Sequence, residues 1–279
     1  MNRLDGKIAV TTGGTQGLGA AIAHRFAVAG ARGLVICGRN ADRGEAVSRQ
    51  ISRGHEGVRV VFVRADLESV DDCRNVIATA DREFGRVDIL VNAAATTERG
   101  TLVDTSEALF DRMFATNVRA PFFLMQETVK LMIRDGVEGS IVNIGSVSST
   151  AGQPFISAYC ASKGALATLT KNSGYALMRN RIRVNQLDIG WMASDGEDRI
   201  QRTYHNAEDG WQARAGLERP FGRLIDPEEV ARAVNFIASD DCGLMTGSVI
   251  PFDQSVDGAC SFVPPAPSEP MATSESDQA

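Results

Sequence analysis

The stretch IAVTTGGTQGLG, residues 8–19, decides the fold that this sequence predicts. Its first part, residues 8–12, is a short apolar run, which is typical of a strand buried in a parallel sheet. Glycines follow at positions 13, 14, 17 and 19, and residues 20–29 continue as an apolar helical pattern that Gly30 closes. A strand, a glycine turn and a helix in this order are the context in which a glycine loop binds a pyrophosphate, because glycine carries no Cβ and the helix N-terminus offers free N–H groups. The spacing, Gly-x3-Gly-x-Gly, is also compatible with an ordinary glycine-rich turn.

The second predicted strand, residues 34–37, ends at Gly38, Arg39 and Asn40. A carboxylate at this position pairs with the ribose of NAD, whereas an arginine accommodates the 2′-phosphate of NADP. No carboxylate follows this strand directly, so we predict that NADP is favoured over NAD. Arg39 is equally compatible with a solvated charge at a helix start or with stacking on adenine.

Strands and helices alternate along the rest of the chain. Further strands are predicted at residues 58–64, 87–91, 140–145, 182–187 and 248–252. This alternation is typical of a doubly wound α/β fold, a parallel sheet with helices on both faces. No linker divides the chain, so we expect one catalytic domain over residues 1–262. Residues 263–279 are rich in Pro, Ser, Glu and Ala and predict a disordered tail.

Ligands bind such sheets at the carboxyl ends of the strands. The glycine loop, Asp66, Ala93, Ser146 and Gly190 all follow predicted strands and should gather at one edge. Asp66 could hydrogen-bond an adenine amino group, or it could only cap a turn or a helix. The convergence of these strand ends, rather than any single motif, indicates a dinucleotide site.

A tyrosine and a lysine, Tyr159 and Lys163, stand four residues apart in a segment predicted as a helix over residues 158–179. Positions i and i+4 share one helix face, about 5–6 Å apart at Cβ. A cation about 4 Å from a phenolate contributes roughly 4 kcal/mol at an effective dielectric of about 20, which equals about three pKa units. We therefore expect Lys163 to bring the pKa of Tyr159 close to neutral, where a phenol can transfer protons. Such a pair is common on helices, but Ser146 at a strand end completes a site for alcohol or carbonyl chemistry.

The composition excludes several other functions. The 279 residues carry a net charge of −6 and only 6% aromatic side chains, so neither a basic surface nor a stacking platform for nucleic acid is expected. Five scattered cysteines without a CxxC pair favour reduced thiols and a cytoplasmic location, and three histidines without a ligand-like pair argue against a metal site. No apolar run reaches membrane length, and the N-terminus leads into a strand without a signal peptide.

The middle of the chain contains two less regular segments. A long helical stretch, residues 105–134, is interrupted by Pro121, which should kink it. Asn117 lies shortly before this proline among apolar residues, so its amide must be satisfied by the core or belong to the site. Residues 194–214 are polar with little periodicity and suggest a mobile flap over the site. Asp226, followed by proline and two glutamates, predicts a helix start.

Taken together, these motifs resemble those of the short-chain dehydrogenase/reductase family over residues 4–253. The motifs are Thr12-Gly13-x3-Gly17-x-Gly19, Asn117, Ser146, Tyr159-x3-Lys163 and Gly190. The resemblance implies an NAD(P)-dependent oxidoreductase with a single Rossmann-fold domain. It also implies a seven-stranded sheet in the order 3-2-1-4-5-6-7 and a homotetramer or dimer built through the two long helices.

The resemblance further implies a role for each matching residue. Tyr159 would exchange a proton with the substrate oxygen, and Ser146 would hydrogen-bond that same oxygen. Lys163 would lower the pKa of the tyrosine and bind the nicotinamide ribose, and Asn117 would hold a water molecule of a proton relay. The residues expected to contact the cofactor are Thr12, Gly13, Thr15, Gln16, Gly17, Leu18, Gly19, Arg39, Asn40, Asp66, Leu67, Asn92, Ala93, Ala94, Tyr159, Lys163, Ile189, Gly190 and Met192.

Three segments depart from the family's usual pattern. Asn92-Ala93-Ala94-Ala95 replaces Asn-Asn-Ala-Gly, Ile189-Gly190 replaces Pro-Gly, and Asp253-Gln254-Ser255 replaces Asp-Gly-Gly. None of these changes removes a chemical group that the reaction needs. They could alter the cofactor affinity or the floor of the pocket.

The predicted substrate contacts follow the catalytic serine and the sixth strand. Ser148 and Gln153 could bind hydroxyl groups, Trp191 could stack on a sugar ring, and His205 lies in the flap. These side chains favour a small polyhydroxylated alcohol or ketone over a fatty acyl chain. A 3-oxoacyl (acyl carrier protein) or other ketone reductase remains an alternative. A third hypothesis is a nucleotide-binding redox sensor without catalytic activity. The presence of Ser146, Tyr159 and Lys163 argues against it.

Overall fold

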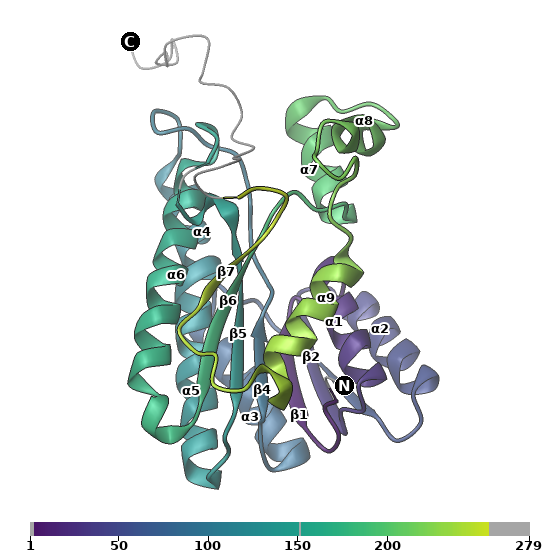
Figure 1. Cartoon of the computed structure of the whole chain (residues 1–279), viewed down its shortest axis with the longest axis vertical. Helices are drawn as coiled ribbons and strands as arrows, with labels where there is room; N and C mark the ends of the chain where they lie inside the picture. Colours follow the sequence, from purple (N-terminus) through teal and green to yellow (C-terminus); the bar gives the residue numbers. More distant parts are fainter. Residues whose placement is uncertain (1–2, 151, 257–279) are drawn as a thin grey trace.

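One parallel sheet organises the chain (Figure 1). The computed structural model describes residues 3–150 and 152–256, and the predicted tail lies outside these ranges. The strand order is β3-β2-β1-β4-β5-β6-β7, which confirms the predicted order. The strands are β1 (Ile8–Thr12), β2 (Gly33–Gly38), β3 (Arg59–Arg64), β4 (Ile89–Asn92), β5 (Ser140–Ser146), β6 (Arg183–Ile189) and β7 (Val249–Phe252).

Helices cover both faces of this sheet, as predicted (Figure 1). One face packs against α1, α2 and α9 through a core that includes Phe26 and Val234. The other face packs against α3, α5 and α6, with Ile77 and Leu124 among its buried residues. The helices are α1 (Gly17–Val28), α2 (Ala41–Gly54), α3 (Val70–Phe84), α4 (Glu107–Phe114), α5 (Ala120–Asp135), α6 (Ser157–Ala176), α7 (Asp195–His205), α8 (Trp211–Leu217) and α9 (Pro227–Ala238).

The long helical stretch is interrupted before Pro121 rather than at it. A π-helical turn, Ala115–Arg119, joins α4 to α5, and Pro121 lies in the first turn of α5. Helical residues precede Pro121 without a break, so its missing N–H removes one helical hydrogen bond, and the π-helical turn directly before it marks the resulting irregularity. The predicted start of α9 is confirmed: the Asp226 carboxylate accepts from the N–H of Glu228, and Glu229 reaches back to the N–H of Asp226. No helix within residues 3–150 and 152–256 has the length and apolar character needed to span a membrane.

The segment predicted as an irregular flap contains two helices, α7 and α8, which corrects the prediction. Both stand beyond the carboxyl ends of the strands (Figure 1). Ser194 caps α7 by accepting from the N–H of Glu197 at 3.2 Å, and three acidic residues occupy the first turn. Polar contacts hold the two helices together, including one from Trp211 Nε1 to Asp198 at 2.7 Å. α7 buries no side chain fully and contains few apolar residues, so the apolar pattern that identifies a helix is weak in its sequence.

Candidate active site

A cavity of about 1130 Å³ opens at the carboxyl ends of the strands, the edge at which the sequence predicted a site. It is larger than a typical small-molecule pocket of about 300–1,000 Å³, so a cofactor and a substrate fit together. The glycine loop lines one end, and α7 lines another. All the predicted site residues line this cavity except Thr12, Asn92 and Asn117.

The glycine loop is shaped to receive a phosphate. Gly13 and Gly17 adopt the left-handed backbone conformation, with φ of 65° and 50°. A Cβ on Gly19 would overlap the carbonyl oxygen of Gly13, so the start of α1 packs directly on the loop. No side chain caps the N-terminus of α1, which leaves its N–H groups available to an anion. These features fit a dinucleotide pyrophosphate.

Thr12 joins the ends of two neighbouring strands. Its Oγ1 accepts hydrogen bonds from the N–H groups of Ala93 at 3.0 Å and Ala94 at 3.1 Å. A Cβ on Gly13 would lie only 3.1 Å from the Cα of Ala94, so the glycine loop and the segment after β4 are in close contact. Thr12 is itself buried and therefore shapes the cofactor site through the backbone.

The end of β2 presents positive charge to the cavity. Arg39 is exposed and lines it, and Arg43, which the sequence reading missed, lines it from the first turn of α2. Asn40 caps α2 by accepting from the N–H of Arg43 at 2.8 Å. Asp66 also lines the cavity, and its carboxylate accepts from the N–H of Glu68 at 3.1 Å, so its side chain forms a turn as well.

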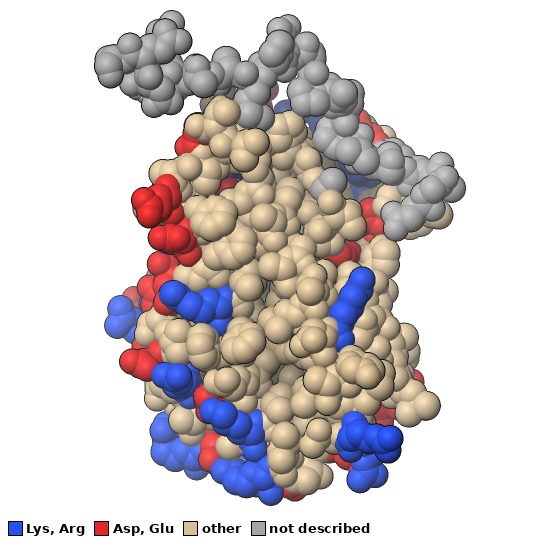
Figure 2. Space-filling view, turned by 90° about the vertical axis from the view of Figure 1, so that its left-hand side faces the viewer, with Lys and Arg blue, Asp and Glu red and all other residues tan. Residues whose placement is uncertain are grey.

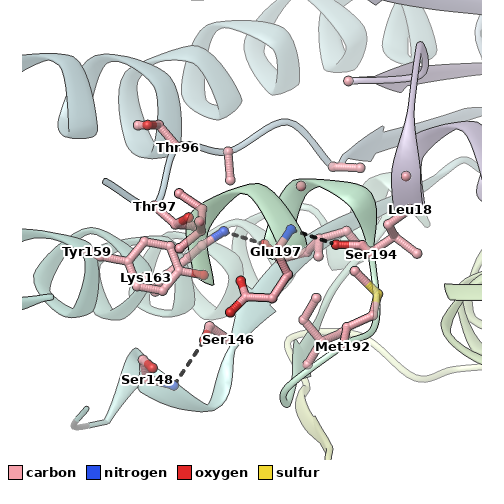
Figure 3. Close-up of a pocket in the computed structure, with 18 of the residues that line it drawn as sticks. Leu18, Thr96, Thr97, Ser146, Ser148, Tyr159, Lys163, Met192, Ser194 and Glu197 are labelled. Carbon is pink, nitrogen blue, oxygen red and sulfur yellow. Dashed lines mark hydrogen bonds between the residues drawn. The ribbon is translucent and has the colours of Figure 1, made fainter. Parts of the chain in front are cut away.

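Ser146, Tyr159 and Lys163 meet in the cavity (Figure 3). Ser146 ends β5, and its Oγ accepts from the N–H of Ser148 at 3.1 Å. Tyr159 and Lys163 project from the first turns of α6. The Lys163 ammonium is buried, donates to the carbonyl oxygen of Ile144 at 2.7 Å, and lies 5.7 Å from the centre of the Tyr159 ring. The predicted trio is therefore assembled at one point.

The predicted effect of Lys163 on Tyr159 is wrong for this structure. Burial raises the pKa of Tyr159 to about 12, although the Ser146 hydroxyl opposes the shift. The ammonium lies over the ring and bonds a carbonyl, so it does not offset the lost hydration of the phenolate. Burial also lowers the pKa of Lys163 to about 8, while the carboxylate of Asp188 acts to raise it. Loss of hydration is the largest cause of the pKa shift of both groups.

Asn117 is buried in the π-helical turn, and its amide is held by protein groups. Its Nδ2 donates to the carbonyl of Thr96 at 3.0 Å and to Ser162 Oγ at 3.0 Å, and its Oδ1 accepts from the N–H of Thr96 at 2.9 Å. Ser162 in turn donates to the carbonyl of Tyr159 at 2.8 Å. Asn117 therefore ties the loop after β4 to the helix that carries the tyrosine.

A buried carboxylate, Asp188, escaped the sequence reading. Its Oδ1 accepts from the N–H of Ser146 at 3.1 Å and from Gln186 Nε2 at 2.6 Å, and its Oδ2 accepts from Ser149 Oγ. Burial raises its pKa, whereas these hydrogen bonds and the charge of Lys163 lower it. In sequence it is one of several polar residues in β6, and only the pairing of β5 with β6 reveals its partners.

The predicted substrate residues Ser148, Gln153, Trp191 and His205 all line the cavity. The Trp191 indole is already engaged by the protein: Trp211 stacks on it with 5.7 Å between ring centres, and the Arg219 guanidinium lies 5.3 Å from the Trp191 ring centre. His205 accepts from Arg99 Nε at 3.1 Å, which brings the end of α7 to the loop after β4.

Two charged residues of this region, Arg99 and Glu197, were missed. Both line the cavity and are half-buried. The available signal was weak, because Glu197 reads as a first-turn acidic residue of a helix and Arg99 as a loop charge. The remaining cofactor candidates Leu67, Asn92, Ile189, Gly190 and Met192 follow or end strands β3, β4 and β6, and all but Asn92 line the cavity.

Comparisons with known proteins agree with this geometry. A family model described as enoyl-(acyl carrier protein) reductase matches residues 13–256. The sorbitol dehydrogenase of Cereibacter sphaeroides is 34% identical over 243 residues, which cover 86% of this chain and 93% of that protein. An NADP-dependent (R)-specific alcohol dehydrogenase of Lentilactobacillus kefiri is 31% identical over 249 residues, covering 88% and 95%. The crystal structure of a short-chain type dehydrogenase/reductase from Mycobacterium marinum superposes with a TM-score of 0.82 at 29% identity, covering 91% of this chain and 96% of that one.

Proposed function

The chain belongs to the short-chain dehydrogenase/reductase family, and from this membership we propose that it transfers hydride between NADP and a small polyhydroxylated secondary alcohol or the matching ketone. Membership establishes the coarser statement, that the chain is an oxidoreductase acting on alcohol or ketone groups with a nicotinamide cofactor. The observation that carries the finer proposal is the meeting of Ser146, Tyr159 and Lys163 in the cavity that the glycine loop borders.

In the proposed mechanism Tyr159 moves the proton. It donates to the carbonyl oxygen during reduction and accepts from the alcohol during oxidation. A pKa of about 12 keeps Tyr159 protonated at neutral pH, which is the form that reduction needs. The hydroxyl of Ser146, which lines the same part of the cavity, would stabilise the same substrate oxygen as charge develops on it. Lys163 supplies a positive charge beside the ring.

The cofactor would supply or accept the hydride at its nicotinamide ring. Gly13, Gly17 and Gly19 would hold its pyrophosphate, and the ring would lie next to Tyr159 and Lys163. We propose that NADP is preferred, because Arg39 and Arg43 face the cavity where no carboxylate ends β2. The similar alcohol dehydrogenase of Lentilactobacillus kefiri is named as NADP-dependent, which supports the same preference.

The cofactor preference can be tested with Arg39→Asp. A new carboxylate beside the 2′-phosphate should weaken NADPH binding by roughly tenfold or more and leave NADH binding less affected. Fluorescence titration of both cofactors measures the two dissociation constants. Arg49→Asp, an exposed position on α2 that lies outside the cavity, is the control. An unchanged NADPH/NADH ratio in Arg39→Asp would refute the assignment of Arg39.

The substrate proposal is supported by the polar side chains at the reaction end of the cavity, Ser148, Gln153 and His205, and by the similar protein named as a sorbitol dehydrogenase. Reduction of a 3-oxoacyl or related thioester is the second candidate, because the matching family model is described as an acyl carrier protein reductase. Turnover of a panel of polyols and ketoses, compared with turnover of acetoacetyl thioesters, separates the two candidates. Thioester activity without polyol activity would replace the first candidate by the second.

Tyr159→Phe tests the mechanism itself. Removal of one hydroxyl from the cavity should lower kcat by at least roughly 100-fold, the size of a general acid contribution, and should leave NADPH binding intact. Tyr175→Phe removes the same atom from the exposed part of α6 and is the matched control. Unchanged turnover in Tyr159→Phe would sink the mechanism. A wild-type protein that binds NADPH but reduces or oxidises nothing in the panel would favour the redox-sensor alternative.

We also propose a dimer or homotetramer and a reducing, cytoplasmic setting. Figure 2 shows the side formed by α4, α5 and α6 as a broad uncharged area with lysines and arginines below it. Phe110 and Phe122 are exposed on two of these helices, which supports an interface there. Light scattering measures the assembly, and a monomer at micromolar concentration would refute it. The described cysteines are free thiols, which suits a reducing compartment.

A further inference from the structure

Two opposite charges face the reaction centre without forming a salt bridge to each other. Arg99 lies in the loop after β4, and Glu197 lies in the first turn of α7. Negative charge on Glu197 raises the pKa of Tyr159, so the carboxylate is close enough to act on the phenol. Burial lowers the pKa of Arg99, whereas the charges of Glu197 and Tyr159 raise it. Both residues therefore lie close enough to Tyr159 for their charges to interact with it.

The Glu197 carboxylate is held by one oxygen and offers the other. Its Oε1 accepts from Trp191 Nε1 at 2.8 Å and from Gln201 Nε2 at 2.8 Å. In the part of the chain that the structure describes, no hydrogen bond reaches Oε2. The carboxylate points toward Ser146 in Figure 3. Because Trp191 and Gln201 fix its orientation, Oε2 is a preorganised acceptor in the cavity that Ser146 and Tyr159 line.

The Arg99 guanidinium is held in the same manner. Its Nε donates to His205 Nε2 at 3.1 Å, and its Nη1 donates to the carbonyl of Thr97 at 3.0 Å. The Arg99 Cζ lies 5.3 Å from the centre of the Phe155 ring. Within residues 3–150 and 152–256, Arg99 forms no salt bridge. The charge of Glu197 raises the pKa of Arg99 without a direct contact between the two groups. Its remaining N–H groups are donors without a protein carboxylate to receive them.

We propose that Glu197 and Arg99 together recognise the hydroxyl group next to the reacting carbon of a neutral polyol or ketose. Glu197 Oε2 accepts from this hydroxyl, while Arg99 donates to the same oxygen or to the next one. The inference rests on the proposed function and names the part of the substrate that the site reads. It assigns Trp191 the task of aiming Glu197, in place of stacking on a sugar.

The charges exclude other substrate classes at this position. A hydroxyl both donates and accepts, so a polyol satisfies the carboxylate and the guanidinium at once. A carboxylate or phosphate on the substrate would satisfy Arg99 but would face the negative charge of Glu197. An acyl chain would remove water from both charged groups and give neither a partner, which is costly. A site built to bind a hydroxyl rejects the analogue that lacks it.

The test compares substrates that differ by one hydroxyl, butane-2,3-diol and butan-2-ol, together with pentitols and hexitols. In Glu197→Gln the side-chain oxygen can still accept from Trp191 and Gln201, but an NH₂ group replaces Oε2. Loss of the Glu197 charge acts on Tyr159 with every substrate, so the ratio of kcat/KM for the diol and the polyols to kcat/KM for butan-2-ol is the readout. This ratio should fall roughly 10- to 100-fold, as for a lost hydrogen bond to a charged group. Arg99→Met should show the same selectivity. Glu208 is exposed after α7 and lies outside the cavity, so Glu208→Gln should leave kcat/KM unchanged for both the diol and butan-2-ol.

The outcomes separate this inference from the proposed function. Equal losses on the diol and on butan-2-ol would overturn the recognition role and leave the oxidoreductase mechanism in place. If the wild type turns over thioesters alone, both proposals fall. Binding is also measured without turnover, as the thermal shift that a polyol produces in NADP-loaded Tyr159→Phe. A polyol shift that is lost when Glu197→Gln is added supports recognition, and a shift that persists overturns it.

Discussion

Replacement of the buried lysine should make the protein more stable and inactive. Lys163 is 3% exposed, and burial lowers its pKa from 10.5 to about 8. One pKa unit corresponds to about 1.36 kcal/mol, so keeping the ammonium charged at pH 7 costs about 3 kcal/mol of folding free energy. The lost hydrogen bond to the Ile144 carbonyl offsets about 1 kcal/mol of this gain. Lys163→Met, which has a similar length, should therefore be about 2 kcal/mol more stable at pH 7.

The stability difference between Lys163→Met and the wild type should shrink as the pH rises. Because the folded pKa of Lys163 lies below the unfolded one, the penalty is fully present below about pH 8, shrinks as the pH rises, and is gone above 10.5. The wild type should thus gain about 1 kcal/mol relative to Lys163→Met between pH 7 and pH 9. Other titrating groups are common to both proteins and cancel in the difference.

Urea denaturation followed by far-UV circular dichroism at pH 7, 8 and 9 measures this difference. Lys171→Met, an exposed lysine on the same helix, is the control and should stay within about 0.5 kcal/mol of the wild type at each pH. A Lys163→Met protein that is less stable than the wild type at pH 7 would refute the reasoning. A stability difference that does not change with pH would refute it equally, because the ammonium would then not be the source of the cost.

Three further changes probe other parts of the site. Gly19→Ala puts a Cβ against the Gly13 carbonyl and should weaken NADPH binding by roughly tenfold or more in a fluorescence titration; unchanged affinity would contradict the shape argued for the loop. Asp188→Asn removes the charge that raises the pKa of Lys163, so the loss of activity at alkaline pH should begin at a lower pH; a pH–rate profile identical to that of the wild type would show that Asp188 acts only on the backbone. Asn117→Ala removes the hydrogen bonds to Thr96 and Ser162 and should cost about 2–4 kcal/mol in denaturant unfolding, and a cost below about 1 kcal/mol would mean that the loop after β4 is held by other contacts.

The sheet could be predicted from sequence because its signals are local. Most strands contain an apolar run followed by small or polar residues, and β1 is buried along its whole length. The glycine spacing marks the first turn, and Asp226 marks the start of α9. The strand order itself came from the resemblance to a family, since parallel pairing leaves no local mark in the sequence. The helices α7 and α8 were missed because polar contacts, not an apolar stripe, hold them.

The electrostatics of the site could not be predicted, because they depend on contacts between distant segments. The helical spacing of Tyr159 and Lys163 correctly placed the two side chains on one face. It said nothing about how much water each loses, and that loss moves the pKa of each group away from its charged form. Arg99 and Glu197 are separated by almost a hundred residues, so their common cavity appears only after folding.

Gly145 and Asp188 illustrate how one sequence position is explained only by another. As a letter beside the catalytic serine, Gly145 reads as the small residue that ends a strand. In the structure a Cβ at this position would overlap Asp188 Oδ1 and crowd Gln186, which lie opposite on β6. The glycine therefore makes room for the carboxylate that binds the N–H of Ser146 and acts on Lys163. The cost of burying Asp188 is offset by hydrogen bonds from Ser149, Gln186 and the N–H of Ser146 and by the charge of Lys163. The carboxylate in turn stabilises the ammonium beside the tyrosine.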